Sequence, residues 1–170
     1  MFRSATLAAA LMMSMFTAPA MAQQKAQTVE KATHGSWAIR CLESNQSLCA
    51  MTQIGNSDKG DRLVSVEFQK YPAPQEANGR SFIGQMVITA PTGVLLPAGV
   101  AVAVDGRDEG VAIYKVCYPQ QCIVVEPVSS EFVNKLKKGS AVTMTLRDAG
   151  GKEAKATLSL TGFTKAFNSL

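Results

Sequence analysis

The sequence predicts a mainly β domain: an antiparallel β-sandwich or partly open barrel of about nine strands with one short helix, reinforced by disulfides. Short apolar runs that alternate with polar residues recur at close spacing, a pattern typical of antiparallel sheets with one buried face. Stretches rich in Gly, Pro, Asn and Asp separate these runs and indicate turns. Four cysteines follow the amino-terminal apolar segment, and an even number favours disulfide bonds.

The first 22 residues have the features of a cleaved secretory signal peptide. Arg3 supplies a positive charge, an apolar stretch follows at 5–16, and Ala20-Met21-Ala22 offers a small-x-small cleavage site. The apolar stretch is shorter than the roughly 20 residues that cross a bilayer. We therefore expect an exported protein, periplasmic or at the cell surface, with no transmembrane segment after cleavage.

The remaining chain is expected to form one domain. Residues 23–33 are polar and lack periodicity, so we expect a flexible leader there and a single β domain at 34–170. Removing 22 of the 170 residues leaves 148, enough to bury a core of ordinary size. Because Arg3 is the one basic residue removed, 16 basic residues remain against 13 acidic ones. This small excess gives no indication of nucleic-acid binding.

Strands are expected wherever apolar and polar residues alternate between turn signals. Gly84 interrupts one of these segments, which indicates a bulge or a close approach of another backbone. Residues 71–80, rich in Pro, Gly and Asn, are expected to form a loop. The expected strands lie at 37–41, 48–54, 63–68, 81–90, 100–105, 111–117, 122–126, 141–147 and 155–160.

Residues 130–138 form the one segment that predicts a helix. Ser129 and Ser130 are good N-caps, and Gly139 is expected to follow the helix end. Phe132, Val133 and Leu136 share one face.

The stretch 110–127 predicts a hairpin closed by a disulfide. Its turn is Tyr118-Pro119-Gln120-Gln121, because proline suits the first central position of a tight turn. Such a turn places Cys117 opposite Cys122, within reach of a disulfide. The exposed tip, consisting of Tyr118, Pro119, Gln120 and Gln121, is a candidate for recognition.

The same turn fixes the expected register of the two hairpin strands. Val116 is expected to pair with Ile123, and Tyr114 with Val125. We expect the face that carries Val116 and Ile123 to pack into the core.

Four cysteines allow three disulfide connectivities. Local pairing joins Cys41 to Cys49 and Cys117 to Cys122, and closes loops of nine and six residues. Chain entropy assigns about 2–3 kcal/mol to each short loop and about 4–5 kcal/mol to a long one. Crossed bridges would therefore stabilise more, whereas the hairpin geometry favours the local pair at Cys117. A zinc site is a poor match, because zinc ligands favour spacings such as C-x2-C.

Motifs of the common enzyme classes are missing from the sequence. It contains no G-x-S-x-G, S-x-x-K, C-x-x-C, P-loop or G-x-G-x-x-G pattern. The one histidine, His34, is interpreted as a surface side chain, and Trp37 as a core residue because it alternates with Ile39 and Cys41. We expect a non-enzymatic protein without catalytic, cofactor-binding or metal-binding residues.

Carboxylates keep a hydrolase of envelope polymers open as the alternative function. Asp105, Asp108 and Glu109 form the densest acidic group and could act with Glu67 or Glu126, because such enzymes use paired acids. The group lacks the spacing of an EF-hand calcium loop. A solvated turn is the simpler interpretation.

The carboxyl-terminal part of the chain is basic. From Glu131 onward seven basic residues stand against three acidic ones. Lys135, Lys137 and Lys138 of the expected helix are candidates for contact with anionic lipid or polysaccharide, although a solvated helix face explains them more simply. Beside a binding protein and a hydrolase, a third functional hypothesis is an exported enzyme inhibitor that inserts the exposed tip at 118–121 into another enzyme's cleft.

Four segments in this order carry a family resemblance: 37–41 (WAIRC), 49–53 (CAMTQ), 96–100 (LPAGV) and 158–163 (LSLTGF). Together with the C-x4-C spacing of Cys117 and Cys122, they resemble the invasion-associated locus B family of exported bacterial proteins. One departure is Gln121, which stands where that family is expected to have glycine. The resemblance implies a periplasmic or surface protein of Gram-negative bacteria, with some relatives linked to host-cell entry. It brings no catalytic residues, so we expect a binding protein with an unknown envelope or host-surface partner, whether protein, lipid or glycan.

Overall fold

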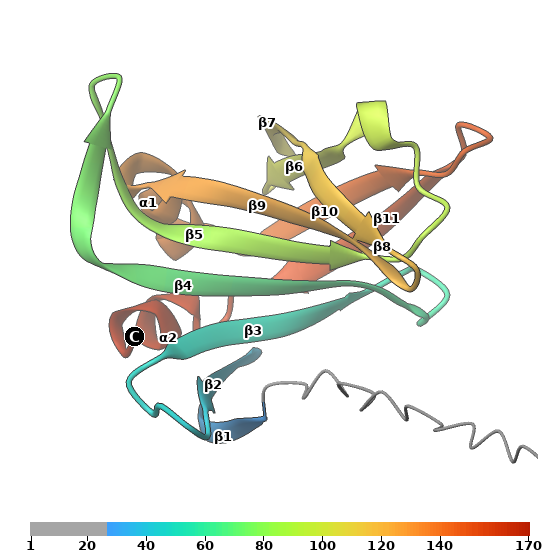
Figure 1. Cartoon of the computed structure of the whole chain (residues 1–170). Helices are drawn as coiled ribbons and strands as arrows, with labels where there is room; N and C mark the ends of the chain where they lie inside the picture. The colour runs from blue at the N-terminus through green and yellow to red at the C-terminus, as the bar shows by residue number, and fades with distance from the viewer. Residues whose placement is uncertain (1–26) are drawn as a thin grey trace, which may run out of the picture.

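A computed structural model describes residues 27–170, and Figure 1 shows their arrangement. Eleven strands in this part of the chain form one antiparallel sheet that curls into a nearly closed barrel. This confirms the predicted fold class. The predicted signal peptide at 1–22 and the first residues of the predicted leader lie outside the described residues.

The sheet follows the order β7-β6-β10-β11-β3-β4-β5-β9-β8, and β1 and β2 pair off this path beside β3. The helices are η1 (Leu96–Ala98) before β6, α1 (Ser130–Lys138) between β9 and β10, and α2 (Phe163–Asn168) after β11. The strands are β1 (Thr28–His34), β2 (Trp37–Leu42), β3 (Cys49–Asn56), β4 (Arg62–Ala77), β5 (Arg80–Ala90), β6 (Val100–Val104), β7 (Arg107–Ala112), β8 (Tyr114–Tyr118), β9 (Gln121–Ser129), β10 (Ala141–Arg147) and β11 (Glu153–Ser159).

Strand β1 corrects the prediction of a flexible leader for residues 28–33, the part of that segment that pairs with β2. Residues 28–34 pair antiparallel with β2 along its whole length. Their composition is polar because most of their side chains are exposed, and the ladder to β2 orders them without a buried face. A polar edge strand of this kind has no hydrophobic periodicity to mark it in the sequence.

The hairpin of β4 and β5 is longer than predicted, and residues 71–80 are not a loop. Asn78 and Gly79 both have positive φ, 51° and 70°, as a two-residue turn that matches strand twist requires. A register shift between Lys70 and Gln75 accommodates the proline-rich part, and the hairpin extends beyond the barrel (Figure 1). Gly84 lies where a Cβ would come within 2.3 Å of the Gln69 carbonyl oxygen, which confirms the predicted close approach.

An aromatic cluster fills one end of the core. The rings of Trp37, Phe68 and Phe163 meet edge to face, with centroids 5.3–5.7 Å apart. Trp37 is buried, which confirms its predicted core position, and its indole donates a hydrogen bond to the Ser159 carbonyl at 3.0 Å. Phe163 belongs to α2, a six-residue helix too short for periodicity to have predicted it.

Gln53 joins β3 to β11 where the two strands diverge. Their backbones share a single register pair, Thr157 with Asn56. Beyond it, the Gln53 amide donates to the Ser159 carbonyl and accepts from the Ser159 amide, both at 2.8 Å. The side chain therefore continues the ladder between the two strands.

Helix α1 has the predicted bounds and cap. The Ser129 hydroxyl accepts a hydrogen bond from the Phe132 amide at 3.1 Å, and Val133 and Leu136 are buried. Gly139 ends the helix in extended backbone. A Cβ there would lie 2.9 Å from the side chains of Val104 and Leu160, so close packing explains this glycine.

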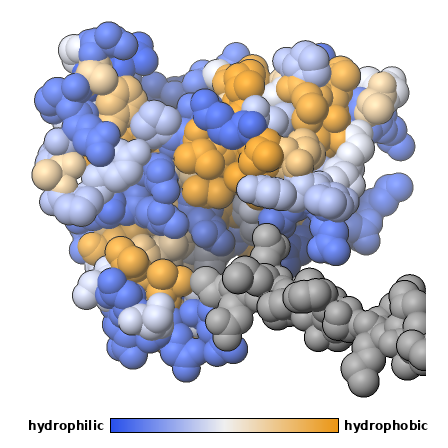
Figure 2. Space-filling model, in the orientation of Figure 1, coloured by the Kyte–Doolittle hydropathy of each residue, from blue (hydrophilic) through white to orange (hydrophobic). Residues whose placement is uncertain are grey.

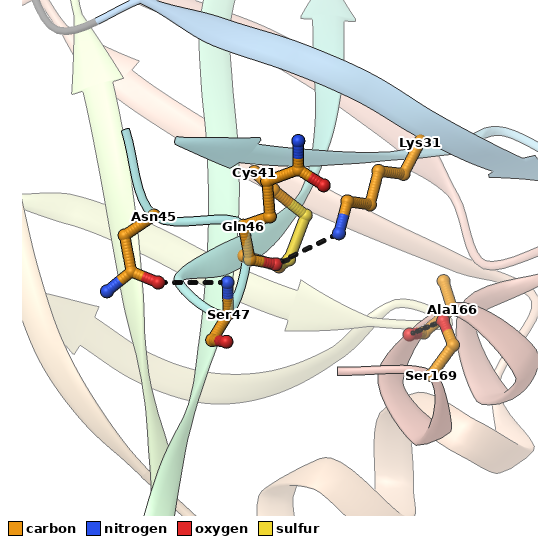
Figure 3. The surroundings of a disulfide bond; sticks show 8 residues. Lys31, Cys41, Asn45, Gln46, Ser47, Ala166 and Ser169 are labelled. Carbon is orange, nitrogen blue, oxygen red and sulfur yellow. Dashed lines mark hydrogen bonds between the residues drawn. A yellow bond between two sulfur atoms is a disulfide. The ribbon is translucent and has the colours of Figure 1, made fainter. Parts of the chain in front are cut away.

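Both local disulfides predicted from the sequence are present, and no cysteine is free. Cys41 and Cys49 are directly opposite on β2 and β3, and Cys117 and Cys122 on β8 and β9. Figure 3 shows the first bridge beside the loop between β2 and β3. There Lys31 of β1 donates to the Gln46 carbonyl, and Asn45 accepts from the Ser47 amide. The crossed connectivities and the zinc alternative are thereby excluded.

Candidate binding groove at the barrel seam

The barrel is left open along a seam between β7 and β9. On one side of the break, β7 pairs with β6 alone. On the other side, β8 pairs with β9 only as far as Val124, so residues 125–129 of β9 have a strand partner, β5, on one edge alone. The chain crosses from one side to the other at Ile113, the residue between β7 and β8. Two strand edges without partners therefore border the seam.

A groove of about 590 Å³ occupies this seam. Both strand edges line it, through residues 109–112 of β7 and 126–129 of β9. Its apolar lining reaches core side chains, including Met86 and Val102. Phe82 and Phe132 add aromatic surface. The groove is thus open to solvent, with charged side chains among its lining and nearly buried apolar side chains where it reaches the core.

An ion pair ties α1 to β7 at the rim of the groove. The Lys135 ammonium lies 2.8 Å from the Glu109 carboxylate and 3.4 Å from that of Glu131. The hydrogen bond to Glu109 is the main cause that raises the pKa of Lys135 above its ordinary value. The Glu109 side chain is only 13% exposed, so this carboxylate is held against the barrel by its partner.

Two further charges of the groove have no ion-pair partner within residues 27–170. Glu126 accepts a hydrogen bond from the Ile113 amide at 3.4 Å, at the point where the chain crosses the seam. Arg80 lines the groove from the start of β5. Neither takes part in a salt bridge of the described chain, so both charges are available to a ligand.

Exposed apolar side chains continue from the groove along the segment that crosses the seam. Val111, Ile113, Val116 and Tyr118 are 42–55% exposed. Figure 2 shows apolar side chains gathered over the middle and upper part of this face, where β7, β8 and β9 lie. Such a concentration is typical of a surface that contacts a partner.

The exposure of Val116 corrects the predicted packing of the hairpin. Val116 does pair with Ile123, as expected, but Tyr114 pairs with Val124 and not with Val125. A register shift at Lys115 causes this difference and leaves Val116 on the outer face. Tyr114 instead packs against the core, where burial raises the pKa of its hydroxyl.

The candidate recognition tip and the candidate lysines do not share one site. Tyr118, Pro119, Gln120 and Gln121 are all exposed at the end of the β8–β9 hairpin, and none of them lines the groove.

The three candidate lysines of α1 have different surroundings. Lys135 lies at the groove. Lys137 donates to the Asn168 side chain and lies 5.3 Å from the centroid of the Phe167 ring. Lys138 is exposed. They therefore do not form one patch of free basic groups.

The candidate carboxylates of a hydrolase are largely engaged in the fold. Asp105 accepts hydrogen bonds from the amides of Ser140 and Ala141, and Asp108 accepts from the Gly110 amide. Glu67 lines a different groove. Of the five acids considered, only Glu109 and Glu126 share the seam groove.

The described chain shows neither a metal-binding cluster nor a membrane-spanning helix. His34 is half-buried at the end of β1. Residues 27–170 contain no cluster of three or more His, Cys, Asp or Glu side chains placed to hold a metal ion. No helix among these residues has the length and apolar character needed to cross a membrane.

Sequence reasoning missed the groove itself. Arg80 and Phe82 lie at the start of β5, whereas Phe132 lies in α1, far along the chain, and the fold brings all three to one groove. No motif marks them. The nearest signal is Gly110, whose φ of 113° accompanies the register shift in β7 and favours glycine over other residues.

The fold and the groove define a disulfide-reinforced, nearly closed antiparallel β-barrel with a lateral groove. The profile of a protein family described as "Invasion associated locus B (IalB) protein" matches residues 37–170. The chain belongs to this family, and the resemblance seen in the sequence is confirmed. The family's description names no enzymatic activity.

A solved structure has the same fold. The crystal structure of invasion associated protein B from Bartonella henselae matches with a TM-score of 0.62 and 24% sequence identity. The match covers 84% of this chain and 94% of that one. A sequence comparison with curated proteins gives no match.

Proposed function

We propose that this protein is a non-enzymatic binding module of the bacterial envelope that contacts its partner through the segment of β7 and β8. The observation that carries the proposal is the exposure of four large apolar side chains within eight residues, at 111, 113, 116 and 118. Solvation of such a surface is unfavourable, and a partner that covers it removes the cost.

The segment is also held in place before binding. Pairing with β6 and β9 fixes its two halves, and the Cys117–Cys122 disulfide fixes its end. A rigid surface loses less conformational entropy on association than a flexible loop. These features support binding more than catalysis, because the acids considered for catalysis mostly cap backbone amides or form ion pairs.

Export to the periplasm or the cell surface is part of the proposal, and it is supported by the signal features of residues 1–22. The similar Bartonella protein is called invasion associated, so a host-surface component is one possible partner beside envelope protein, lipid and glycan. We expect no nucleic-acid partner.

Site-specific photo-cross-linking tests the proposal. A photoreactive amino acid replaces Val116 or Tyr118 in one set of proteins and Glu43, an exposed residue of the loop between β2 and β3, in the control. Living cells of the source bacterium are irradiated, and cross-linked products are counted. We expect products from positions 116 and 118 at least about fivefold above position 43. Equal labelling from all three positions would remove the basis for the proposal.

A further inference from the structure

We propose that the seam groove binds an extended peptide segment of a partner protein by strand addition. This inference rests on the proposed binding function and names the class of ligand and the mode of contact. Four features support it: unpaired strand edges, an apolar floor, an unpaired carboxylate, and the apolar surface that continues from the groove.

The strand edges give the groove its preference for a polypeptide. No strand pairing joins β7 to β9 in the described chain, and no backbone hydrogen bond outside the strands links them. The edges nevertheless line one groove. Unpaired backbone amides and carbonyls beside an apolar surface are favourable partners for an extended peptide, which supplies complementary groups at the spacing of a strand.

The floor of the groove favours an apolar anchor in the peptide. Met86 and Val102 are core residues that line the groove, so an inserted side chain would contact the interior of the barrel. Side chains alternate between the two faces of an extended peptide. One set would therefore point into the floor while the other set faces solvent or the exposed side chains of Val111 and Ile113.

The carboxylate of Glu126 favours a basic residue near the anchor. Glu109 is already occupied by Lys135, whereas Glu126 has no cation partner in the described residues. A Lys or Arg of the peptide would pair with Glu126. A fatty acyl chain would fill the floor but leave Glu126 and both strand edges without partners, so lipid is the weaker candidate.

The first step of the test selects peptides and locates them on the protein. The probe is a display library of ten-residue linear peptides, applied to the chain without residues 1–22. We expect enrichment of peptides with alternating apolar residues and an adjacent Lys or Arg. Binding of a synthesised peptide should slow hydrogen exchange at least about tenfold for amides in 109–112 or 126–129, while exchange in the loop at 43–48 stays unchanged.

The second step separates backbone pairing from side-chain contact. N-methylation of one of the two alternating sets of peptide residues should weaken binding at least about tenfold, since it removes the donors that pair with a strand edge. Glu126→Gln should weaken a Lys-bearing peptide about three- to tenfold and leave a matched peptide with norleucine in that position unaffected. Glu43→Gln is the matched control, which should change neither affinity.

Several outcomes overturn the inference. Failure of the library to enrich any peptide does so, as does a selected peptide that leaves exchange at the seam unchanged or binds equally well when N-methylated. Slower hydrogen exchange at the seam amides in the presence of phosphatidylglycerol vesicles would assign the groove to lipid. Slower exchange at higher protein concentration without peptide would assign it to a second copy of the chain. Cross-linking from positions 116 and 118 is scored separately, so strand addition can fail while the binding function stands.

Discussion

The hydrogen bonds of Gln53 should contribute more to stability than those of any ordinary surface glutamine, and Gln53→Met tests this directly. The substitution keeps the length of the side chain and removes its donor and its acceptor. Both groups bond Ser159 at 2.8 Å. They lie where β3 and β11 share only one register pair, so nothing else joins the two backbones at this level.

The expected loss follows from the partners that Ser159 retains. Each hydrogen bond contributes about 1 kcal/mol net, and a buried donor left unpaired costs about 1–3 kcal/mol. The Ser159 carbonyl keeps its bond from the Trp37 indole, but the Ser159 amide loses its side-chain acceptor. Because the site is only partly buried, water offsets some of this cost. We expect Gln53→Met to lower the free energy of unfolding by about 2–3 kcal/mol.

Urea unfolding followed by tryptophan fluorescence measures the effect. Trp37 is the only tryptophan of the chain, and it lies in the core beside Ser159. The control is Gln85→Met, which removes one bond to Gln69 on the outer face of the sheet and should cost less than about 1 kcal/mol. A loss from Gln53→Met that is no larger than that of the control would show that the side chain does not bridge the strands.

Three further predictions concern the disulfides, a glycine and an ion pair. Replacing both cysteines of either disulfide with alanine should cost about 2–3 kcal/mol in urea unfolding, and adding reductant should then cost the variant only what the remaining bridge contributes. Gly162→Ala should lower stability by more than about 3 kcal/mol, since its Cβ would lie 2.1 Å from the His34 carbonyl oxygen. Gly79→Ala, with positive φ but open space, should cost only about 1–2 kcal/mol; equal losses would contradict the steric explanation. Folding raises the pKa of Lys135 above its ordinary value of 10.5. The ion pair with Glu109 therefore stabilises the fold fully at pH values below 10.5, and this stabilisation is lost as the pH rises through the folded pKa. Glu109→Gln should therefore lower the Lys135 pKa in an NMR titration, and an unchanged pKa would contradict the pair.

Local patterns predicted much of this fold because their physics is local. Alternation of apolar residues follows from the two faces of a strand, and it marked most strands within a few residues. The cap at Ser129 gave the start of α1. The hairpin turn placed Cys117 opposite Cys122, and both bridges proved local.

The predictions were wrong, or lacking, where contacts between distant segments determine the local structure. Strand β1 has exposed polar side chains and is ordered by its neighbour β2, which no window of its own sequence reveals. The register shift at Lys115 changes which side of β8 is buried, and one extra residue is enough to invert that face. The groove was beyond prediction for a stronger reason. It is a gap between segments, and its residues share no pattern along the chain.

The seam itself follows from the topology and can be tested without a ligand. Residues 107–118 supply both β7, which pairs with β6, and β8, which pairs with β9. This single segment pairs first with β6 and then, after Ile113, with β9. It cannot pair with both strands at the same level of the barrel, so β7 and residues 125–129 of β9 are left without a strand between them. Amides of β9 at 122–124 lie between two strands, whereas those at 125–129 have a neighbour on one side only.

Hydrogen exchange of the free protein should reveal this difference. We expect uniform protection at 122–124 and, beyond it, fast exchange of those amides in 125–129 that point away from β5, because an edge N–H is open to water. Pro127 has no amide proton and serves as a gap in the pattern. Slow exchange throughout 125–129 would mean that the barrel closes in solution. The seam would then be unable to accept a strand, whereas the apolar surface at 116 and 118 would remain exposed.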